Sequence, residues 1–189
     1  GTFFFLYLDI NKKIKDMIST YAHADKQIKG YSNSKIASGE KNDCVVRAIA
    51  AATDCNYDDA HSLVKKEMNR KDRQGTLNAD ITSAMKKFAK SGFELGGKNF
   101  KVGILDRSST SNYYKLYGEV VRRDKTVKSF IKTYPKGTYL VLVSKHAFTV
   151  KDGVLIDNAG EEFRPTRKVS KAYAIKCEDN QAVQLELFS

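Results

Sequence analysis

The chain has 189 residues, of which 41% are hydrophobic, and this is enough for one domain with a packed core. Its three cysteines lack the close spacing of a disulfide scaffold or a zinc site, so we expect free thiols in a reducing compartment, no bound metal and no cofactor. The formal net charge of +11 is spread along the chain, which favours a solvated basic surface and keeps nucleic acid as a candidate partner.

Residues 1–30 are predicted to be an N-terminal extension made of a strand and an amphipathic helix. The opening FFFLYL is too short to span a membrane and has no basic residue before it, so we expect a cytoplasmic protein without a membrane partner. From residue 9 to residue 29 the apolar side chains recur at three- and four-residue spacing. This spacing predicts a helix that ends at Gly30.

Residues 31–177 are predicted to form one α+β domain, with helices first and an antiparallel sheet second. A turn-rich loop leads to KNDCVVRAIAAAT, residues 41–53, where a polar start changes at Cys44 to the composition of a buried helix. Asp43 is predicted to cap this helix. Two further amphipathic helices are predicted over residues 58–69 and from residue 78 or 80 to Gly92.

The second half of the domain is predicted to contain mainly strands. The tyrosines that precede Arg122 and Arg123 are candidates for stacking on bases, but we expect them to pack on the domain. Strands are predicted over residues 100–105, 138–144, 147–150 and 154–156, with a two-residue turn at Asp152-Gly153. A short helix is predicted over residues 125–134, and edge strands over 163–165 and 172–177.

Three side chains stand at element boundaries in an order that suggests chemistry. Cys44 is predicted in the first turn of its helix, where backbone N–H groups and the helix dipole favour a thiolate. His146 lies between two β-branched runs, Asp157 ends the following strand, and the hairpin between them can bring the two together. Each has an ordinary role as a core thiol, a packed histidine or a turn former, but together they have the order of a nucleophile, its base and the group that orients the base. Asn158 is the alternative third member.

The segments NDCVVRAIAAAT and KHAFTVKDGVLIDN resemble the papain-like cysteine peptidase superfamily, most closely the small peptidase-like proteins of bacteriophages and bacteria. DCVVRA also resembles the nucleophile segment of ovarian-tumour type deubiquitinases. The resemblance implies a papain-like fold, a protein or peptide substrate, Cys44 as nucleophile, His146 as general base and acid, and Asp157 as orienter. A phage origin would place the protein in the host cytoplasm or in a virion.

The chain departs from the papain-like pattern in its oxyanion donor. The family usually has a glutamine several residues before the cysteine, and residues 32–43 contain none. Ser38, Asn42 and the backbone N–H of Cys44 are the candidates to replace it. Lys145, directly before His146, is expected to keep the imidazole neutral if the two charges are close.

Protease is the default reaction, and the same three groups also serve deamidases and transglutaminase-like enzymes. The main rival is an inactive papain-like module that binds nucleic acid, a sliding clamp or a virion assembly, and a third possibility is a structural virion protein. The tail, residues 178–189, contains QLELF, which resembles the peptide that docks bacterial replication proteins on the sliding clamp. The alternative for this tail is a packed last strand, and its docking anchors would be Gln184, Leu185, Leu187 and Phe188.

Overall fold

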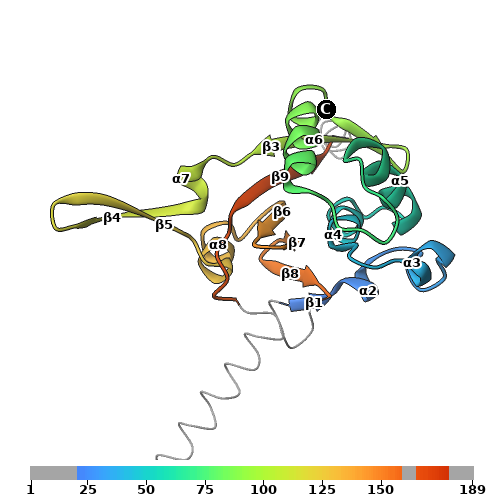
Figure 1. Ribbon diagram of the computed structural model, residues 1–189, viewed down its shortest axis with the longest axis horizontal. Coiled ribbons are helices and arrows are strands. Elements are labelled where there is room, and N and C mark those ends of the chain that lie inside the picture. The colour runs from blue at the N-terminus through green and yellow to red at the C-terminus, as the bar shows by residue number, and fades with distance from the viewer. Residues whose placement is uncertain (1–20, 159–164, 179–189) are drawn as a thin grey trace, which may run out of the picture.

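Within residues 21–158 and 165–178, which the computed structural model describes, the chain forms a seven-stranded sheet with helices on both faces (Figure 1). The helices are α2 (Ala24–Gln27), α3 (Lys35–Gly39), α4 (Cys44–Thr53), α5 (Tyr57–Glu67), α6 (Asn78–Ser91), α7 (Arg107–Thr110) and α8 (Val127–Thr133). The strands are β1 (Tyr21–His23), β2 (Phe93–Leu95), β3 (Lys98–Ile104), β4 (Ser111–Leu116), β5 (Glu119–Asp124), β6 (Thr138–Val143), β7 (His146–Lys151), β8 (Val154–Asp157) and β9 (Lys171–Cys177). The predicted strand at residues 3–8, the first part of the predicted helix, 9–20, and the QLELF segment lie outside the described residues.

The sheet confirms the predicted α+β class. Its strand order is β1-β8-β7-β6-β9-β3-β2, and each of these neighbouring pairs is antiparallel except β1 with β8. The predicted turn between β7 and β8 is also confirmed, since Asp152 and Gly153 have φ values of 48° and 79°. Two successive positive φ values are typical of the two-residue turn whose twist matches that of an antiparallel hairpin.

One strand lies elsewhere than predicted. The segment expected as an edge strand at 172–177 is β9, which lies inside the sheet between β6 and β3. Ala172 is buried in one hydrophobic cluster, while Tyr173 and Ile175 are buried in the other. Partners far away in the sequence therefore decide the place of this strand, which its own composition does not reveal. Of the other predicted edge strand, residues 163 and 164 lie outside the described residues, and Pro165 is in a turn.

Helices α4, α5 and α6 pack on one face of the sheet, and α8 packs on the other (Figure 1). Apart from Arg47, helix α4 is buried from Val45 to Thr53. Its alanines allow a close approach to β7, where the hydroxyl of Thr149 donates to the carbonyl of Ala48. This contact fixes the helix that begins at Cys44 relative to the strand that begins at His146.

The described part of the N-terminal extension is joined to the domain. Residues 21–29 form β1, α2 and a bridge at Lys29. The prediction of a single helix running to residue 29 is therefore wrong for residues 21–29. β1 pairs with β8, and Ile28 is buried in the core. Gly30 follows with φ of 72°, which agrees with the predicted end of the element. Among the described residues, no helix combines the length and apolar character needed to cross a membrane.

A second sheet consists of β4 and β5 alone. The two strands form a long hairpin that projects away from the rest of the protein (Figure 1). The expectation that its tyrosines pack on the domain is wrong for Tyr113 and Tyr117, whose side chains are exposed. The tyrosine-rich composition is typical of a strand, and it does not reveal that this strand projects from the body.

Candidate active site

Helix α4 begins at Cys44, as the sequence predicts. Asp43 occupies the capping position, but its side chain makes no cap, so that prediction is wrong. The buried carboxylate instead accepts hydrogen bonds from the Tyr57 hydroxyl at 2.6 Å and from Nε of Arg47 at 2.9 Å. A charged partner one turn away stabilises a buried carboxylate more than a neutral backbone N–H does. Because the first N–H groups of a helix have no intrahelical partner, the one at Cys44 is left available to a ligand.

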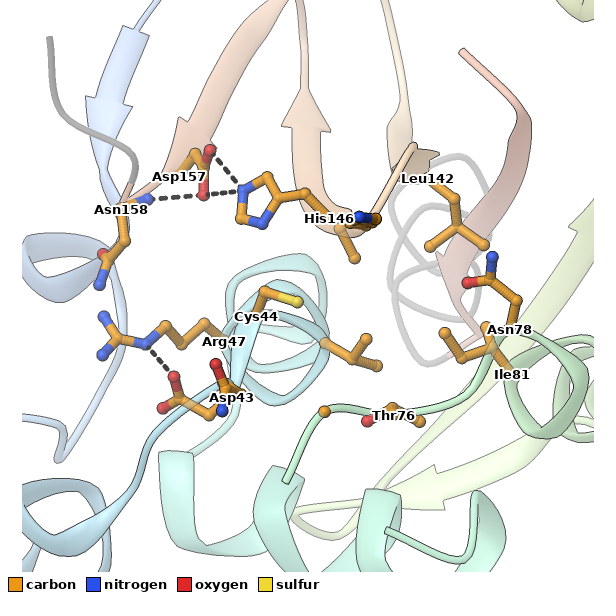
Figure 2. A pocket seen from close by; sticks show the side chains of 15 residues that line it. Asp43, Cys44, Arg47, Thr76, Asn78, Ile81, Leu142, His146, Asp157 and Asn158 are labelled. Carbon is orange, nitrogen blue, oxygen red and sulfur yellow. Dashed lines mark hydrogen bonds and ion pairs between the residues drawn. The ribbon is translucent and has the colours of Figure 1, made fainter. Parts of the chain in front are cut away.

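His146 and Asp157 are joined across the β7–β8 hairpin. The sheet register pairs Thr149 with Ile156, which makes His146 and Asp157 diagonal neighbours on the two strands. Nε2 of His146 lies 2.9 Å and 2.8 Å from the two carboxylate oxygens of Asp157. The prediction that the hairpin brings these two side chains together is therefore confirmed. Figure 2 shows the ring held between the carboxylate and the start of α4, where Cys44 lies.

The surroundings of His146 favour its protonated form. The hydrogen bond to Asp157 and the side chain of Cys44 raise the pKa of His146 to about 9, while partial burial lowers it. The prediction that Lys145 keeps the imidazole neutral is therefore wrong. Lys145 is exposed in the turn before β7, with φ of 59°, so water screens its charge.

The three side chains meet at one cavity of about 490 Å³. Helix α4, the loop before α6 and the ends of β6, β7 and β8 form its walls (Figure 2). Arg47 lies on one side of Cys44 in this view, and the apolar side chains of Leu142 and Ile81 lie on the other. Besides these six residues, the lining includes Asn42, Thr76, Asn78, Lys145 and Asn158.

The other predicted site residues have different positions. Asn158 lines the cavity, but its backbone N–H donates to Asp157 at 2.7 Å, and Asp157 rather than Asn158 is bonded to the histidine. Asn42 also lines the cavity, and its side-chain amide makes a long hydrogen bond of 3.4 Å to the carbonyl of Arg73. Ser38 does not line it, since its hydroxyl is exposed and donates to a carbonyl within α3.

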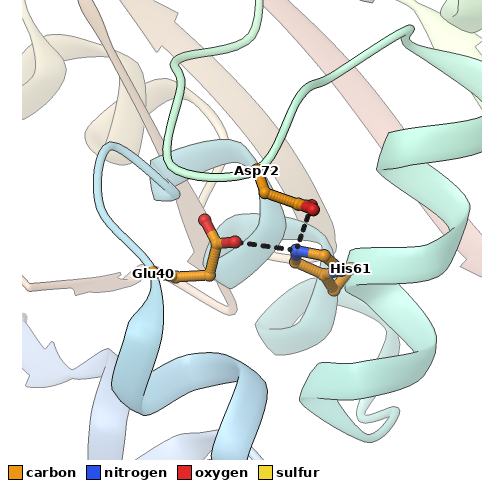
Figure 3. Close-up of side chains that lie close together, drawn as sticks. All are labelled: Glu40, His61 and Asp72. Atoms are coloured by element: carbon orange, nitrogen blue, oxygen red, sulfur yellow. Dashed lines mark hydrogen bonds and ion pairs between the residues drawn. The ribbon is translucent and has the colours of Figure 1, made fainter.

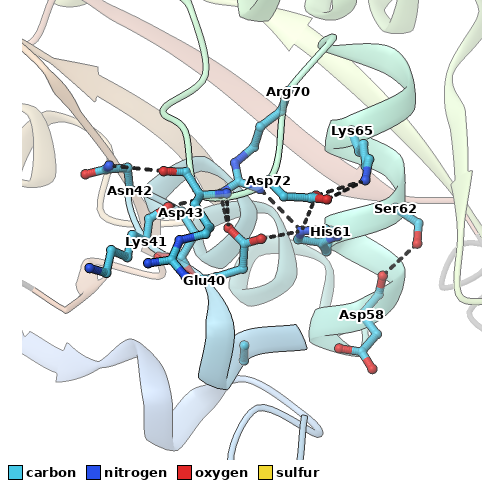
Figure 4. A network of polar contacts seen from close by, with 12 residues as sticks. Glu40, Lys41, Asn42, Asp43, Asp58, His61, Ser62, Lys65, Arg70 and Asp72 are labelled. Atoms are coloured by element: carbon cyan, nitrogen blue, oxygen red, sulfur yellow. Dashed lines mark hydrogen bonds and ion pairs between the residues drawn. The ribbon is translucent and has the colours of Figure 1, made fainter. Parts of the chain in front are cut away.

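A buried ion pair just before Asp43 is not predicted by the sequence. The guanidinium of Arg70 is bonded to the carboxylate of Glu40 and donates to the carbonyl of Lys41 at 3.1 Å (Figure 4). Burial raises the pKa of Glu40, but hydrogen bonds from Arg70, from the backbone of Arg73 and from His61 outweigh it and lower the pKa to about 2. The ion pair thus anchors the loop that leads to Cys44. A lone glutamate and arginine far apart in the sequence give no signal of such a pair.

Glu40, His61 and Asp72 bring their ligand atoms within 4.8 Å of one another, which is close enough to suggest a metal site (Figure 3). Protein cations already neutralise these carboxylates, however. Arg70 is bonded to Glu40, and Nζ of Lys65 lies 2.8 Å from Asp72. Nη1 of Arg70 also lies 3.3 Å from Nε2 of His61. We therefore interpret this cluster as part of the anchor of the loop.

The remaining cysteines lie in different surroundings. Cys55 is buried, and its sulfur lies 3.5 Å from the carbonyl of Thr53 and 3.4 Å from that of Leu95. Cys177 is partly exposed at the end of β9. All three cysteines are free thiols, and Cys44 is the one that lines the cavity together with His146.

Comparisons with protein-family models, with curated proteins and with solved structures give no match to this chain. The residues of the cavity itself indicate the chemistry that it can perform. Those residues are a thiol at a helix N-terminus, an imidazole in the same cavity, and a carboxylate that is hydrogen-bonded to the imidazole.

Proposed function

We propose that this protein is a papain-like cysteine hydrolase that cleaves amide bonds in a protein or peptide by acyl transfer. The observation that carries the proposal is the position of His146, which is hydrogen-bonded to Asp157 and lines the same cavity as Cys44, whose side chain helps to raise its pKa. A nucleophile, a base bonded to it and a third group that orients the base are the diagnostic arrangement of covalent catalysis. The resemblance of both motif segments to small phage and bacterial peptidase-like proteins supports the same reaction.

In the proposed mechanism the proton resides on His146 before substrate binds, because the pKa of this imidazole is raised to about 9. The Cys44 thiolate attacks the carbonyl carbon, and the C–S bond forms as the carbonyl π electrons move to oxygen. His146 then donates its proton to the leaving amine as the C–N bond breaks. Water attacks the thioester with His146 as base, which releases the acid and restores the thiolate and the imidazolium.

The oxyanion formed in the first step needs donors near the sulfur. The Cys44 backbone N–H lies at the start of α4, and the side chain of Asp43 does not cap that helix end. Asn42 adds a side-chain amide on the cavity wall, and its 3.4 Å bond to Arg73 is weak enough to be exchanged for a stronger one. We propose these two groups as the oxyanion donors in place of the missing glutamine.

A mixed peptide library, read by mass spectrometry, tests the proposal. The wild-type protein should generate new peptide termini, whereas Cys44→Ala should generate none and Asp157→Asn should be slower. Cys177→Ala is the matched control, because it removes a thiol that does not line the cavity. A gain of 1 Da without new termini would instead assign deamidation, since an amide then becomes an acid. If wild type and Cys44→Ala give identical spectra, the proposal of a hydrolase is wrong.

The rival function is a binding module that keeps this fold without using the thiol. The exposed hairpin β4–β5 favours it, because it presents large side chains to solvent outside the cavity. Binding by the hairpin is also compatible with hydrolysis in the cavity, since the hairpin residues do not line the cavity.

A further inference from the structure

The hairpin formed by β4 and β5 exposes large side chains that a folded domain usually covers. The exposed fractions are 53% for Tyr113, 47% for Leu116, 98% for Tyr117 and 69% for Val120. Residues directly opposite each other in the register share one face of the hairpin, so Tyr113 lies beside Arg122. Exposed apolar groups gathered in one place mark an interaction site more often than scattered ones do.

The turn at the tip of the hairpin holds a tyrosine, Tyr117, in an unfavourable backbone conformation. Tyr117 and Gly118 are the two turn residues, with φ of 50° and 86°. Asparagine followed by glycine is the preferred pair in such a turn, and a bulky residue at positive φ is unusual. Since Tyr117 is 98% exposed, packing within the protein does not offset this cost. Backbone strain of this kind points to a function for the side chain.

The base of the hairpin is firmly held. Lys125 is buried, and its Nζ donates to the carbonyl of Ser109 at 2.9 Å and to that of Ser111 at 3.1 Å. The Ser111 hydroxyl donates to Asp124 at 3.2 Å across the first pair of residues. An isolated two-stranded hairpin is only marginally stable in water, so these bonds are needed to keep it extended. The tyrosines are thus presented on an ordered support.

Basic side chains lie on the same hairpin as the aromatic ones. Lys115, Arg122 and Arg123 are exposed, and the guanidinium of Arg123 lies 5.3 Å from the centre of the Tyr114 ring. Lysine is depleted in protein–protein interfaces. Proteins that bind single-stranded nucleic acid, by contrast, commonly combine aromatic rings with basic side chains. The net charge of +11 also attracts a polyanion.

We infer that the β4–β5 hairpin binds single-stranded nucleic acid. Tyr113 and Tyr117 stack on unpaired bases, Lys115 and Arg122 contact the phosphates from the face of Tyr113, and Arg123 contacts them from the opposite face. A duplex is the poorer ligand because its bases are already stacked on one another. The inference is independent of the proposed hydrolase, so Cys44→Ala binds as the wild type does.

Fluorescence anisotropy with a labelled 20-nucleotide oligo(dT) tests the inference. Tyr117→Asn removes the ring and keeps a residue that favours positive φ, so the turn is preserved. We expect this variant to bind about tenfold more weakly, in the range measured for loss of one base–aromatic stack. Arg122→Gln with Arg123→Gln should lower the slope of log K against log salt by about 1.4, since each phosphate contact on a single strand contributes about 0.7.

The matched control is Lys86→Gln with Lys90→Gln, which removes the same charge from exposed positions on α6. This control should reduce the affinity less than the arginine pair does. The inference is wrong if wild type does not bind the oligonucleotide at 50 mM salt, if Tyr117→Asn binds as tightly as wild type, or if the control matches the arginine pair. It is also wrong if a duplex of equal length competes as well as the single strand. Thermal unfolding of each variant verifies that the fold is kept.

Discussion

At the scale of single residues, His146 determines how the cavity works. Asp157 is hydrogen-bonded to its Nε2, and Asp157 and the side chain of Cys44 together raise its pKa to about 9. At neutral pH the imidazole is therefore protonated, and the positive charge lies beside the sulfur. An imidazolium beside a thiol favours the thiolate, which is the reactive form in alkylation.

The first prediction concerns the reactivity of Cys44. Alkylation at pH 6, read for each cysteine by mass spectrometry, should be at least about tenfold slower at Cys44 in His146→Ala than in wild type, because the imidazolium is lost. The difference should disappear above about pH 9, where His146 itself loses its proton and a thiol without a partner is ionised as well. Cys177 is the internal control, since it is partly exposed and its rate should be the same in both proteins. A Cys44 that reacts no faster than Cys177 at pH 6 in wild type would contradict the proposed thiolate–imidazolium pair.

The sequence reveals Cys44, His146 and Asp157 because each stands at the end of a recognisable element. A helix start, a strand start and a strand end joined by a tight turn are local features, and the turn brings the last two together. The behaviour of Asp43 and Lys145 cannot be inferred in the same way. The Asp43 carboxylate is bonded to side chains from two helices and does not cap its own, and Lys145 is exposed to solvent. Such outcomes depend on three-dimensional neighbours that spacing does not encode.

At the scale of elements, α4 is held at both its beginning and its middle. Thr149 on β7 is bonded to the carbonyl of Ala48, and the loop before Asp43 is held by the ion pair of Glu40 and Arg70. The helix itself is predictable from its run of apolar residues. The ion pair of Glu40 and Arg70 is not predictable, because Arg70 lies in a charged connector that resembles ordinary surface in the sequence. In the structure the side chain of Arg70 is completely buried.

The second prediction compares a buried and an exposed ion pair of this connector. Arg70→Met should lower the free energy of unfolding by about 3 kcal/mol, because Glu40 is then buried without its cation. Lys65→Met, which removes the exposed partner of Asp72, should cost less than about 1 kcal/mol. Urea unfolding at pH 7 measures both values.

Acid unfolding provides a further check on the same pair. The pKa of Glu40 is lowered from 4.5 to about 2. The ionised carboxylate therefore contributes to the free energy of unfolding above pH 4.5, and this contribution is lost as the pH falls towards 2. The stability difference between wild type and Arg70→Met should therefore narrow in acid. Equal effects of Arg70→Met and Lys65→Met would show that burial of the first pair has no special energetic role.

At the scale of the whole molecule, the chain places two candidate functions on different parts of the fold. The cavity lies where α4 meets the ends of β6, β7 and β8, whereas the hairpin β4–β5 projects away from the body (Figure 1). The sequence predicts most of the body, because its helices are amphipathic and its C-terminal strands are joined by tight turns. It does not predict that β9 is central or that the hairpin is exposed, since both depend on which segments pack together.

The third prediction follows from this separation. Replacing residues 113–122 by Asn-Gly leaves the Asn112 and Arg123 pair closed by a preferred two-residue turn. The base of the hairpin, with Lys125 and its two carbonyl partners, is unchanged. We expect the shortened protein to unfold within a few degrees of wild type and to keep the alkylation rate of Cys44, because the removed residues contribute to neither hydrophobic cluster.

The same protein should lose at least about tenfold in affinity for oligo(dT), since the exposed tyrosines and two of the three basic residues are gone. Anisotropy, alkylation and thermal unfolding on one preparation measure the three properties together. Loss of Cys44 reactivity in a protein that remains folded would show that the hairpin and the cavity are coupled. Retention of full affinity would place the nucleic-acid surface elsewhere on the basic body. Each result therefore decides whether binding and catalysis are carried by separate parts of this fold.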